Sequence, residues 1–147
     1  ITNNHANGGG GGIYISQYSN GCKIEDCTIT NNSCNGDGGG VLAAVSGFYS
    51  GESSVSGKVI VTDNKANGKN ENYTLDTNCF KKAIINIDGY LSSDSIIGVT
   101  TLSTQSKITI TSESIYASSN IFTSDDTNHK VVEHGSDSDQ YLRLEEQ

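Results

Sequence analysis

The chain has 147 residues, of which 33% are hydrophobic and 7% aromatic, and it contains no proline. So few apolar residues cannot fill an ordinary globular core, which leaves a disordered chain or a repetitive fold that buries small and polar side chains. The net charge of −8, with scattered lysines and a single arginine, argues against binding to nucleic acid, whose phosphates need clustered basic residues. Because Val, Ile, Thr and Tyr cluster in short runs, we expect ordered β-strands.

Three segments, at residues 1–8, 29–36 and 61–68, align without gaps. They read Ile-Thr-Asn-Asn-His-Ala-Asn-Gly, Ile-Thr-Asn-Asn-Ser-Cys-Asn-Gly and Val-Thr-Asp-Asn-Lys-Ala-Asn-Gly. Each has another apolar residue twelve positions after its start: Ile13, Val41 and Tyr73. A spacing of about 30 residues suits one coil of a solenoid that carries about three short strands.

Within each repeat the residue types alternate as they would in a stack of strands. The first residue, such as Ile29, is expected to point inward and the following Thr30 outward. The fourth position is always asparagine, and we expect these side chains to hydrogen-bond along the stack: Asn4, Asn32 and Asn64.

The sixth position is always small, and the seventh and eighth are always Asn-Gly. The small residue predicts an inward corner, so Cys34 is interpreted as a buried hydrophobic residue rather than a reactive thiol. The Asn-Gly pairs are expected to supply the positive φ angles of a sharp turn.

The cysteines Cys22, Cys27, Cys34 and Cys79 contain no Cys-x-x-Cys pair, so a zinc site is not favoured. Four cysteines allow three disulfide pairings, and the sequence leaves open both free thiols and one disulfide.

After residue 80 the repeat loosens while strand patterns continue, at residues 83–87, 95–99, 107–111 and 141–144. Residues 124–128 and 135–139 have the composition of loops, and no helix of useful length is predicted. We therefore expect one all-β domain, a parallel β-helix. Residues 1–80 would form its regular coils, and residues 81–147 irregular rungs and a C-terminal cap.

No apolar run approaches the ~20 residues of a membrane-spanning helix, so this segment is not expected to insert into a membrane. The sequence has no methionine, no signal peptide and opens inside a repeat, which favours a segment of a longer protein.

The glycine runs before Ile13 and Val41 could suggest a calcium-binding repeat, but that motif needs aspartate in each turn. Only Asp37 is near, and the equivalent residues are Gly9 and Lys69. No phosphate-binding loop is formed either, because the Gly-Lys-Ser/Thr ending is missing. The glycines are instead expected to let neighbouring coils approach closely.

Catalysis by a β-helix enzyme needs carboxylates that converge with Lys or Arg on one face. The conspicuous acidic residues are Asp125, Asp126, Asp137 and Asp139, in segments that solvated turns explain, while Arg143 lies near the end of the chain. We predict no catalytic residues and no cofactor.

The three histidines do not indicate a functional site either. His5 takes a repeat position that Ser33 and Lys65 also occupy, so it is expected to face solvent. His129 and His134 lie near acidic residues, which permits a metal site without requiring one, and we predict none.

The most specific feature is an insertion within residues 45–56, where the second repeat is four residues longer than the first. Insertions in a solenoid form loops on one face, often the binding face. Phe48 and Tyr49 at such a tip could stack on a sugar or anchor a protein, and we predict them as ligand-binding residues. The alternative is that one ring folds back onto the solenoid.

Residues 1–76 resemble the chlamydial polymorphic outer-membrane proteins and similar adhesin-like surface proteins of other bacteria. Residues 29–32 are similar to that family's apolar-x-Asn motif, with Ile in place of the usual Phe. The segments Gly10-Gly-Gly-Ile13 and Gly38-Gly-Gly-Val41 are similar to its Gly-Gly-Ala motif, with Gly in place of Ala. The resemblance implies a right-handed parallel β-helix at a cell surface, often the stalk or passenger of an adhesin.

The expected function is therefore that of an extracellular or cell-surface structural and adhesive module, not an enzyme, which displays loops to a host protein or a glycan. The alternative is a fragment of a β-helix carbohydrate-active enzyme, either a polysaccharide lyase or a glycoside hydrolase.

Overall fold

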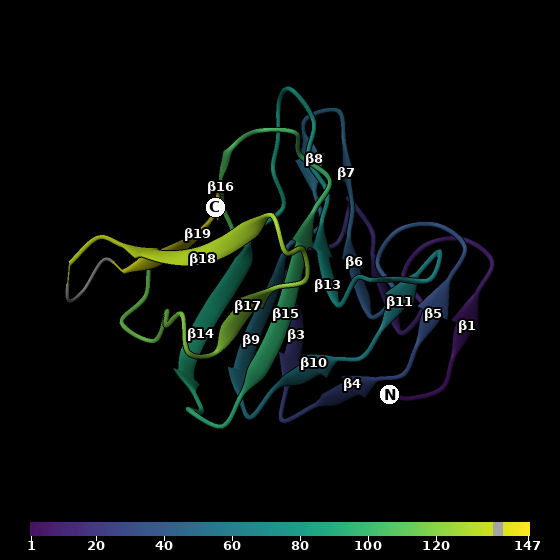
Figure 1. Ribbon diagram of the computed structural model, residues 1–147, viewed down its shortest axis with the longest axis horizontal. Coiled ribbons are helices and arrows are strands. Elements are labelled where there is room, and N and C mark those ends of the chain that lie inside the picture. Colours follow the sequence, from purple (N-terminus) through teal and green to yellow (C-terminus); the bar gives the residue numbers. More distant parts are fainter. Residues whose placement is uncertain (137–139) are drawn as a thin grey trace.

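The computed structural model describes residues 1–136 and 140–147, and in these residues the chain forms strands and turns without a helix (Figure 1). The all-β class predicted from the sequence is confirmed. None of the described residues forms a helix long and apolar enough to cross a membrane.

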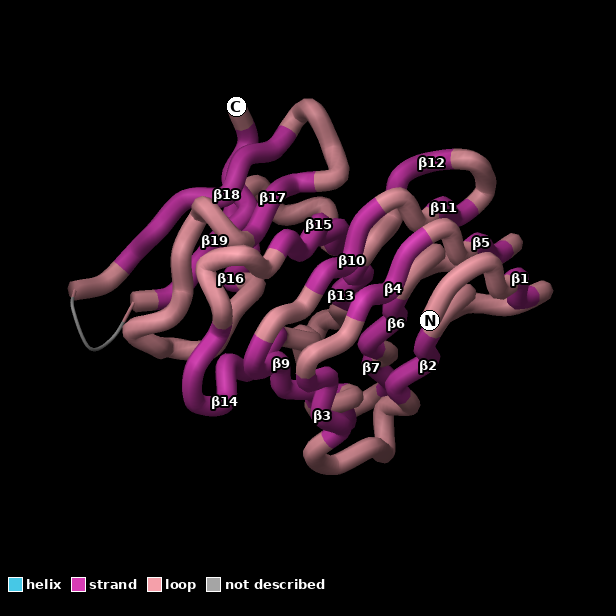
Figure 2. The backbone as a smooth tube through the Cα atoms, turned by 90° about the horizontal axis from the view of Figure 1, so that it is seen from below, coloured by secondary structure: helices cyan, strands magenta, loops and turns pink. Residues whose placement is uncertain are grey.

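Strands from successive repeats pair in parallel and form four rows, and Figure 2 shows the successive turns of the chain side by side. The first row holds β4 (Thr28–Thr30) and β10 (Ile60–Thr62), and the second β1 (His5–Ala6), β5 (Ser33–Cys34) and β11 (Lys65–Ala66). The third holds β2 (Ile13–Ile15), β6 (Val41–Ala43) and β13 (Tyr73–Leu75). The fourth holds β3 (Cys22–Glu25), β9 (Ser53–Gly57) and β14 (Ile85–Leu91).

The register of these rows matches the sequence repeat. Ile29 lies opposite Val61, and Val41 lies between Ile13 and Tyr73. The interior is lined as the alternation predicts, because Ile29 and Val61 are fully buried while the threonines that follow them are partly exposed. Each full repeat supplies four short strands to the parallel rows rather than about three, because the turn at the asparagine separates the first apolar run from the short strand of the second row.

The strand β15 (Ile96–Thr101) changes this pattern. Its start pairs with β10 and its end pairs with β13, so one strand takes the place of two strands and the turn between them. On its other side β15 pairs with β17 (Phe122–Ser124). The first and third rows therefore join with β15 and β17 into one seven-stranded sheet, whereas the second and fourth rows stay separate.

The C-terminal part forms an antiparallel sheet of three strands, β16 (Lys107–Thr109), β19 (Tyr141–Glu146) and β18 (His129–His134). In Figure 1, β18 and β19 project sideways from the parallel strands. Two short antiparallel pairs lie at the repeats: β7 (Val45–Ser46) with β8 (Tyr49–Ser50), and β11 with β12 (Lys69–Asn70).

One hydrophobic core joins the repeats and the C-terminal sheet. It contains Ile29, Val61 and Tyr73 from the repeats together with Leu142 and Leu144 from β19. The Tyr73 hydroxyl lies 2.5 Å from the Ser53 hydroxyl, so the buried phenol keeps a hydrogen-bond partner.

The predicted asparagine stack is present and continues beyond the three repeats. The Nδ2 of Asn4 donates to Oδ1 of Asn32, and Asn32 donates in the same way to Asn64, at 2.9 Å in both cases. Asn64 donates to Asn72 at 3.1 Å, and Asn72 donates to Asp125 at 2.5 Å. This asparagine ladder runs through the interior, since Asn32 and Asn64 are buried.

The prediction for the turn is corrected. Positive φ occurs at the third position of every repeat, at Asn3, Asn31 and Asp63, directly before the ladder asparagine. The Asn-Gly pair adopts it only in the third repeat, where Asn67 and Gly68 connect an antiparallel hairpin. In the first two repeats this pair continues into glycine-rich strand connections instead.

The glycine runs do let neighbouring repeats approach closely, as predicted. A Cβ atom on Gly40 would lie 2.5 Å from the carbonyl oxygen of Asn72 and 2.8 Å from Nδ2 of Asn64. Any larger residue would therefore push the third repeat away from the second.

The predicted strands after residue 80 correspond to β14, β15, β16 and β19, with shifted ends. The predicted loop at 124–128 connects β17 to β18, whereas β18 itself was not predicted. The predicted loop at 135–139 lies partly outside the described residues. All four cysteines are free, and Cys34 is buried, which raises the pKa of its thiol and agrees with its predicted packing role.

Candidate functional site

The two residues predicted to bind a ligand, Phe48 and Tyr49, lie on the β7–β8 hairpin within the insertion. Gly47 turns the hairpin with a φ of 58°, and Phe48 follows it at the tip. Phe48 is 67% exposed and Tyr49 is 60% exposed, so neither side chain is buried against the repeats. Such exposure of two large adjacent rings is unusual for side chains that serve only packing.

The hairpin brings these rings against aromatic residues of the neighbouring repeats. The ring centroids of Tyr49 and Tyr18 are 5.4 Å apart, and those of Phe48 and Phe80 are 4.6 Å apart. Tyr18 and Phe80 are also more than 60% exposed. We call these four residues the aromatic cluster; they extend across three successive turns of the chain.

Hydrogen bonds tie the loop that carries Phe80 to the hairpin. The Nδ2 of Asn78 donates to the Gly47 carbonyl oxygen at 3.0 Å, and the backbone N–H of Val45 donates to Asp76 at 3.0 Å. Asn78 also accepts from the backbone N–H of Phe80 at 2.8 Å. The Phe48–Phe80 pair is therefore positioned by the backbone of both loops.

A cavity of about 290 Å³ lies beside the aromatic cluster. Tyr18, Phe48 and Tyr49 line it, together with polar side chains that can donate and accept hydrogen bonds, namely Gln17, Asn20, Glu52 and Lys81. Pockets that bind small ligands combine apolar walls with a few polar groups in this way.

Of the acidic residues considered for catalysis, the described Asp125 and Asp126 bond to different partners. Asp125 accepts hydrogen bonds from the backbone N–H of Asn72 at 2.7 Å, from the Asn72 side chain and from Thr100 at 2.9 Å, so it terminates the asparagine ladder. Asp126 contacts His129 at 2.7 Å. Asp137 and Asp139 lie outside the described residues.

A cavity of about 600 Å³ at this end of the ladder is lined by Glu71, Asp125 and Asp126, among others. Burial raises the pKa of Glu71, and the nearby charges of Asp37 and Asp125 act in the same direction. A hydrogen bond from the Asn128 backbone, followed by one from His129, lowers the pKa of Asp126. Glu71 and Asp126 in this cavity thus differ in their tendency to hold a proton.

The histidines take separate places. His5 is exposed and lies 2.9 Å from the Ser33 hydroxyl, as expected for a turn residue. His129 contacts Asp126, whereas His134 contacts Glu145 at 3.0 Å. No group of three or more His, Cys, Asp or Glu side chains among the described residues is arranged to hold a metal ion.

The sequence analysis missed Tyr18 and Phe80, which complete the aromatic cluster. Phe80 follows Phe48 by the same interval that separates residues 29 and 61, so the alignment of the second and third repeats already places these two rings at equivalent positions. Tyr18 lies two positions earlier in its repeat than Phe48 does in the next, so the repeat pattern did not point to it.

The fold and the aromatic cluster define an all-β repeat protein with exposed aromatic rings on one side of its repeats. A family model described as the Chlamydia polymorphic membrane protein repeat matches residues 1–16 and 26–44, about a quarter of the chain. These two stretches carry the asparagine and glycine motifs, so the resemblance to a polymorphic membrane protein repeat is supported there. No curated protein and no solved structure matches the chain significantly.

Proposed function

We propose that the chain is part of a right-handed parallel β-helix exposed at a bacterial cell surface, where the aromatic cluster binds a glycan. The parallel rows with matching register and the continuous asparagine ladder support the β-helix. The match to the membrane protein repeat supports the surface location and an adhesin-like role.

The observation that carries the glycan proposal is the exposure of four rings, three of which line a cavity together with polar side chains. Tyr and Phe present apolar faces that can stack on the C–H face of a sugar ring. Gln17, Asn20 and Glu52 beside them can then bond to sugar hydroxyls, which a purely apolar protein contact would leave unpaired.

The test is a glycan and extracellular-matrix array probed with the 147-residue chain and with the double variant Phe48→Ala/Tyr49→Ala. We expect glycan binding that the double variant loses by tenfold or more. Tyr90→Ala is the matched control, because Tyr90 is 61% exposed and lies outside the cluster.

If the double variant binds the glycan as well as the Tyr90→Ala control does, the glycan site does not lie at the aromatic cluster. Binding to matrix proteins alone would replace the glycan with a protein partner, and the absence of any binding would leave the segment as a scaffold.

A second candidate function is carbohydrate cleavage in the 600 Å³ cavity. It is favoured by one observation, the opposite pKa directions of Glu71 and Asp126, which are the properties of a proton donor and of an ionised partner. Release of new reducing ends from a bound polysaccharide, abolished by Glu71→Gln and by Asp126→Asn, would establish the enzyme in place of the adhesin.

A further inference from the structure

The C-terminal sheet contains a cavity of about 470 Å³ that the aromatic cluster does not share. Its wall is formed by Arg143 and Tyr141 of β19, by Thr109 of β16, and by residues of the segments next to β14 and β16: Ile84, Ser112 and Glu113. The volume lies within the range of small-molecule sites.

Antiparallel pairing places the basic group of this cavity. Leu142 and Leu144 point into the core, so Tyr141, Arg143 and Glu145 share the opposite face of β19. Thr109 lies directly across from Arg143 on that face. Arg143 is the single arginine of a chain with a net charge of −8.

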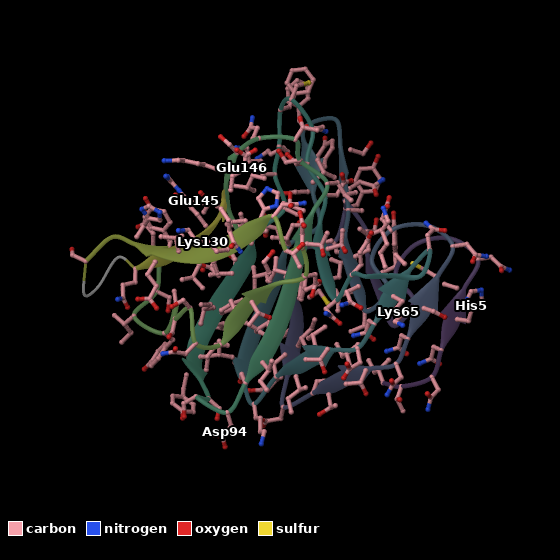
Figure 3. The ribbon with its side chains drawn as sticks, in the orientation of Figure 1. His5, Lys65, Asp94, Lys130, Glu145 and Glu146 are labelled. Atoms are coloured by element: carbon pink, nitrogen blue, oxygen red, sulfur yellow. The ribbon has the colours of Figure 1, made fainter. Side chains whose placement is uncertain are left out.

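Among the described residues, no carboxylate pairs with the guanidinium of Arg143. The guanidinium lies over the Tyr141 ring, 5.1 Å from the centroid. No described carboxylate lies within ion-pair distance of it, and Glu145, the nearest acidic residue along the same face of the strand, contacts His134 instead. Figure 3 shows Glu145 and Lys130 together at this end of the molecule, far from His5 and Lys65.

The other lining groups suit a sugar. The Ser112 hydroxyl oxygen accepts from the backbone N–H of Ile87 at 3.0 Å, which leaves its proton to donate outward. Ile84 is partly exposed and offers an apolar wall. Exposed Glu113 at the rim opposes a doubly charged ligand such as a phosphate monoester and tolerates a single negative charge better.

We propose that this cavity binds a sugar residue that carries one carboxylate, such as a uronic acid. The carboxylate forms a bidentate pair with Arg143, since the guanidinium fork matches its geometry. The sugar hydroxyls bond to Thr109 and Ser112, and the apolar face of the ring contacts Ile84. This site is independent of the aromatic cluster and does not rest on the function proposed for it.

The test is a calorimetric titration of the full chain with D-glucuronate, with D-glucose as the neutral counterpart of the same ring. We expect the chain to bind glucuronate, and to bind glucose with an affinity that is lower by about tenfold or more. Arg143→Gln and Arg143→Lys should each weaken glucuronate binding about tenfold, because the lysine retains charge without the fork. Glu113→Gln should strengthen it, because a like charge leaves the rim.

Lys107→Gln is the matched control, because it removes one positive charge from the same sheet outside the cavity. Equal weakening by Lys107→Gln, or equal affinity for glucose and glucuronate, would overturn the proposal, as would the absence of binding at millimolar sugar. Glu113→Gln keeps the test decisive if an Arg143 variant fails to fold. Retained glucuronate binding by Phe48→Ala/Tyr49→Ala would separate this site from the aromatic cluster.

Discussion

Different interactions stabilise two regions of the molecule, the repeats of residues 1–76 and the antiparallel sheet of β16, β18 and β19. In the repeats, a buried polar ladder and glycine contacts fix the spacing between turns of the chain. In the C-terminal sheet, alternation along β19 separates a leucine face in the core from a polar face in solvent. The first arrangement is specified by position within a repeat, and the second by side-chain alternation alone.

This difference has a structural consequence. A ladder residue supports both of its neighbours, so its loss disturbs two adjacent repeats, whereas loss of a leucine leaves a cavity that its surroundings can partly fill. Because both regions share one hydrophobic core, the comparison can be made by single substitutions in one unfolding reaction.

The largest effect is expected for Asn64→Ala, at the centre of the ladder. Asn64 donates to the carbonyl oxygens of Ile29 and Thr62 and accepts from the backbone and side chain of Asn32, all while buried. The variant leaves several buried groups without partners and should lower the free energy of unfolding by about 3–4 kcal/mol. Urea unfolding followed by far-ultraviolet circular dichroism measures it.

Asn4→Ala is the control for that prediction. Asn4 lies at the exposed end of the same ladder, so its loss should cost less than about 1 kcal/mol. Equal effects of the two substitutions would mean that the ladder does not stabilise the repeats through burial.

Leu142→Ala tests the other region. Leu142 is fully buried, and truncation should lower the free energy of unfolding by about 2–3 kcal/mol. Because Leu142 belongs to the common core, circular dichroism and tyrosine fluorescence should report one shared transition. Val132→Ala, on the outer face of β18, should change much less. Two separate transitions would show that the C-terminal sheet is an independent unit.

More of the structure could be predicted from the sequence in the repeats than in the rest of the chain, because equivalent residues of the repeats recur at matching positions. The alignment of Asn4, Asn32 and Asn64 predicted both register and hydrogen bonding. Asn72 and Asp125 extend the ladder from outside the repeat positions, so no spacing pointed to them. Their places depend on β15, which replaces two strands and a turn.

The same limit of sequence-based prediction applies to the candidate sites. The insertion identified Phe48 and Tyr49, and Phe80 occupies the same repeat position as Phe48, but Tyr18 comes from the shorter first repeat, where no equivalent position pointed to it. The cavity of Arg143 needs β16, β19 and the segment before β14, which are far apart in sequence. Sequence patterns alone do not choose among such long-range antiparallel pairings.

Gly40→Ala tests the spacing of the repeats with a smaller expected effect. The new methyl group would lie 2.5 Å from the Asn72 carbonyl oxygen, so the second and third repeats must separate slightly. We expect a loss of about 1–2 kcal/mol in the free energy of unfolding. Gly8→Ala is the matched control, because nothing lies within 4 Å of its added Cβ and its φ is not positive. A loss as large in Gly8→Ala would point to backbone effects instead.

The smallest effect is a pH dependence that has opposite sign at Glu71, in the third repeat, and at Asp126, in the loop that connects β17 to β18. Burial raises the pKa of Glu71 in the folded state, so its contribution to stability is present at low pH and is lost as the pH rises through the folded pKa. The hydrogen bonds from Asn128 and His129 lower the pKa of Asp126, so its contribution is present at neutral pH and is lost as the pH falls below about 4.

Glu71→Gln should therefore stabilise the chain at pH 7 by about 0.5 kcal/mol, since the amide can still accept from Gly38, and should have no effect near pH 4. Asp126→Asn should destabilise at pH 7 by a similar or smaller amount, because the carboxylate is well exposed. Urea midpoints at both pH values measure the two trends. Destabilisation by both variants at pH 7 would mean that burial does not dominate at Glu71, and that its bonds to Gly38 and Thr74 outweigh the cost of removing its charge from water. Stabilisation by both would mean that the hydrogen bonds to Asp126 do not stabilise the fold.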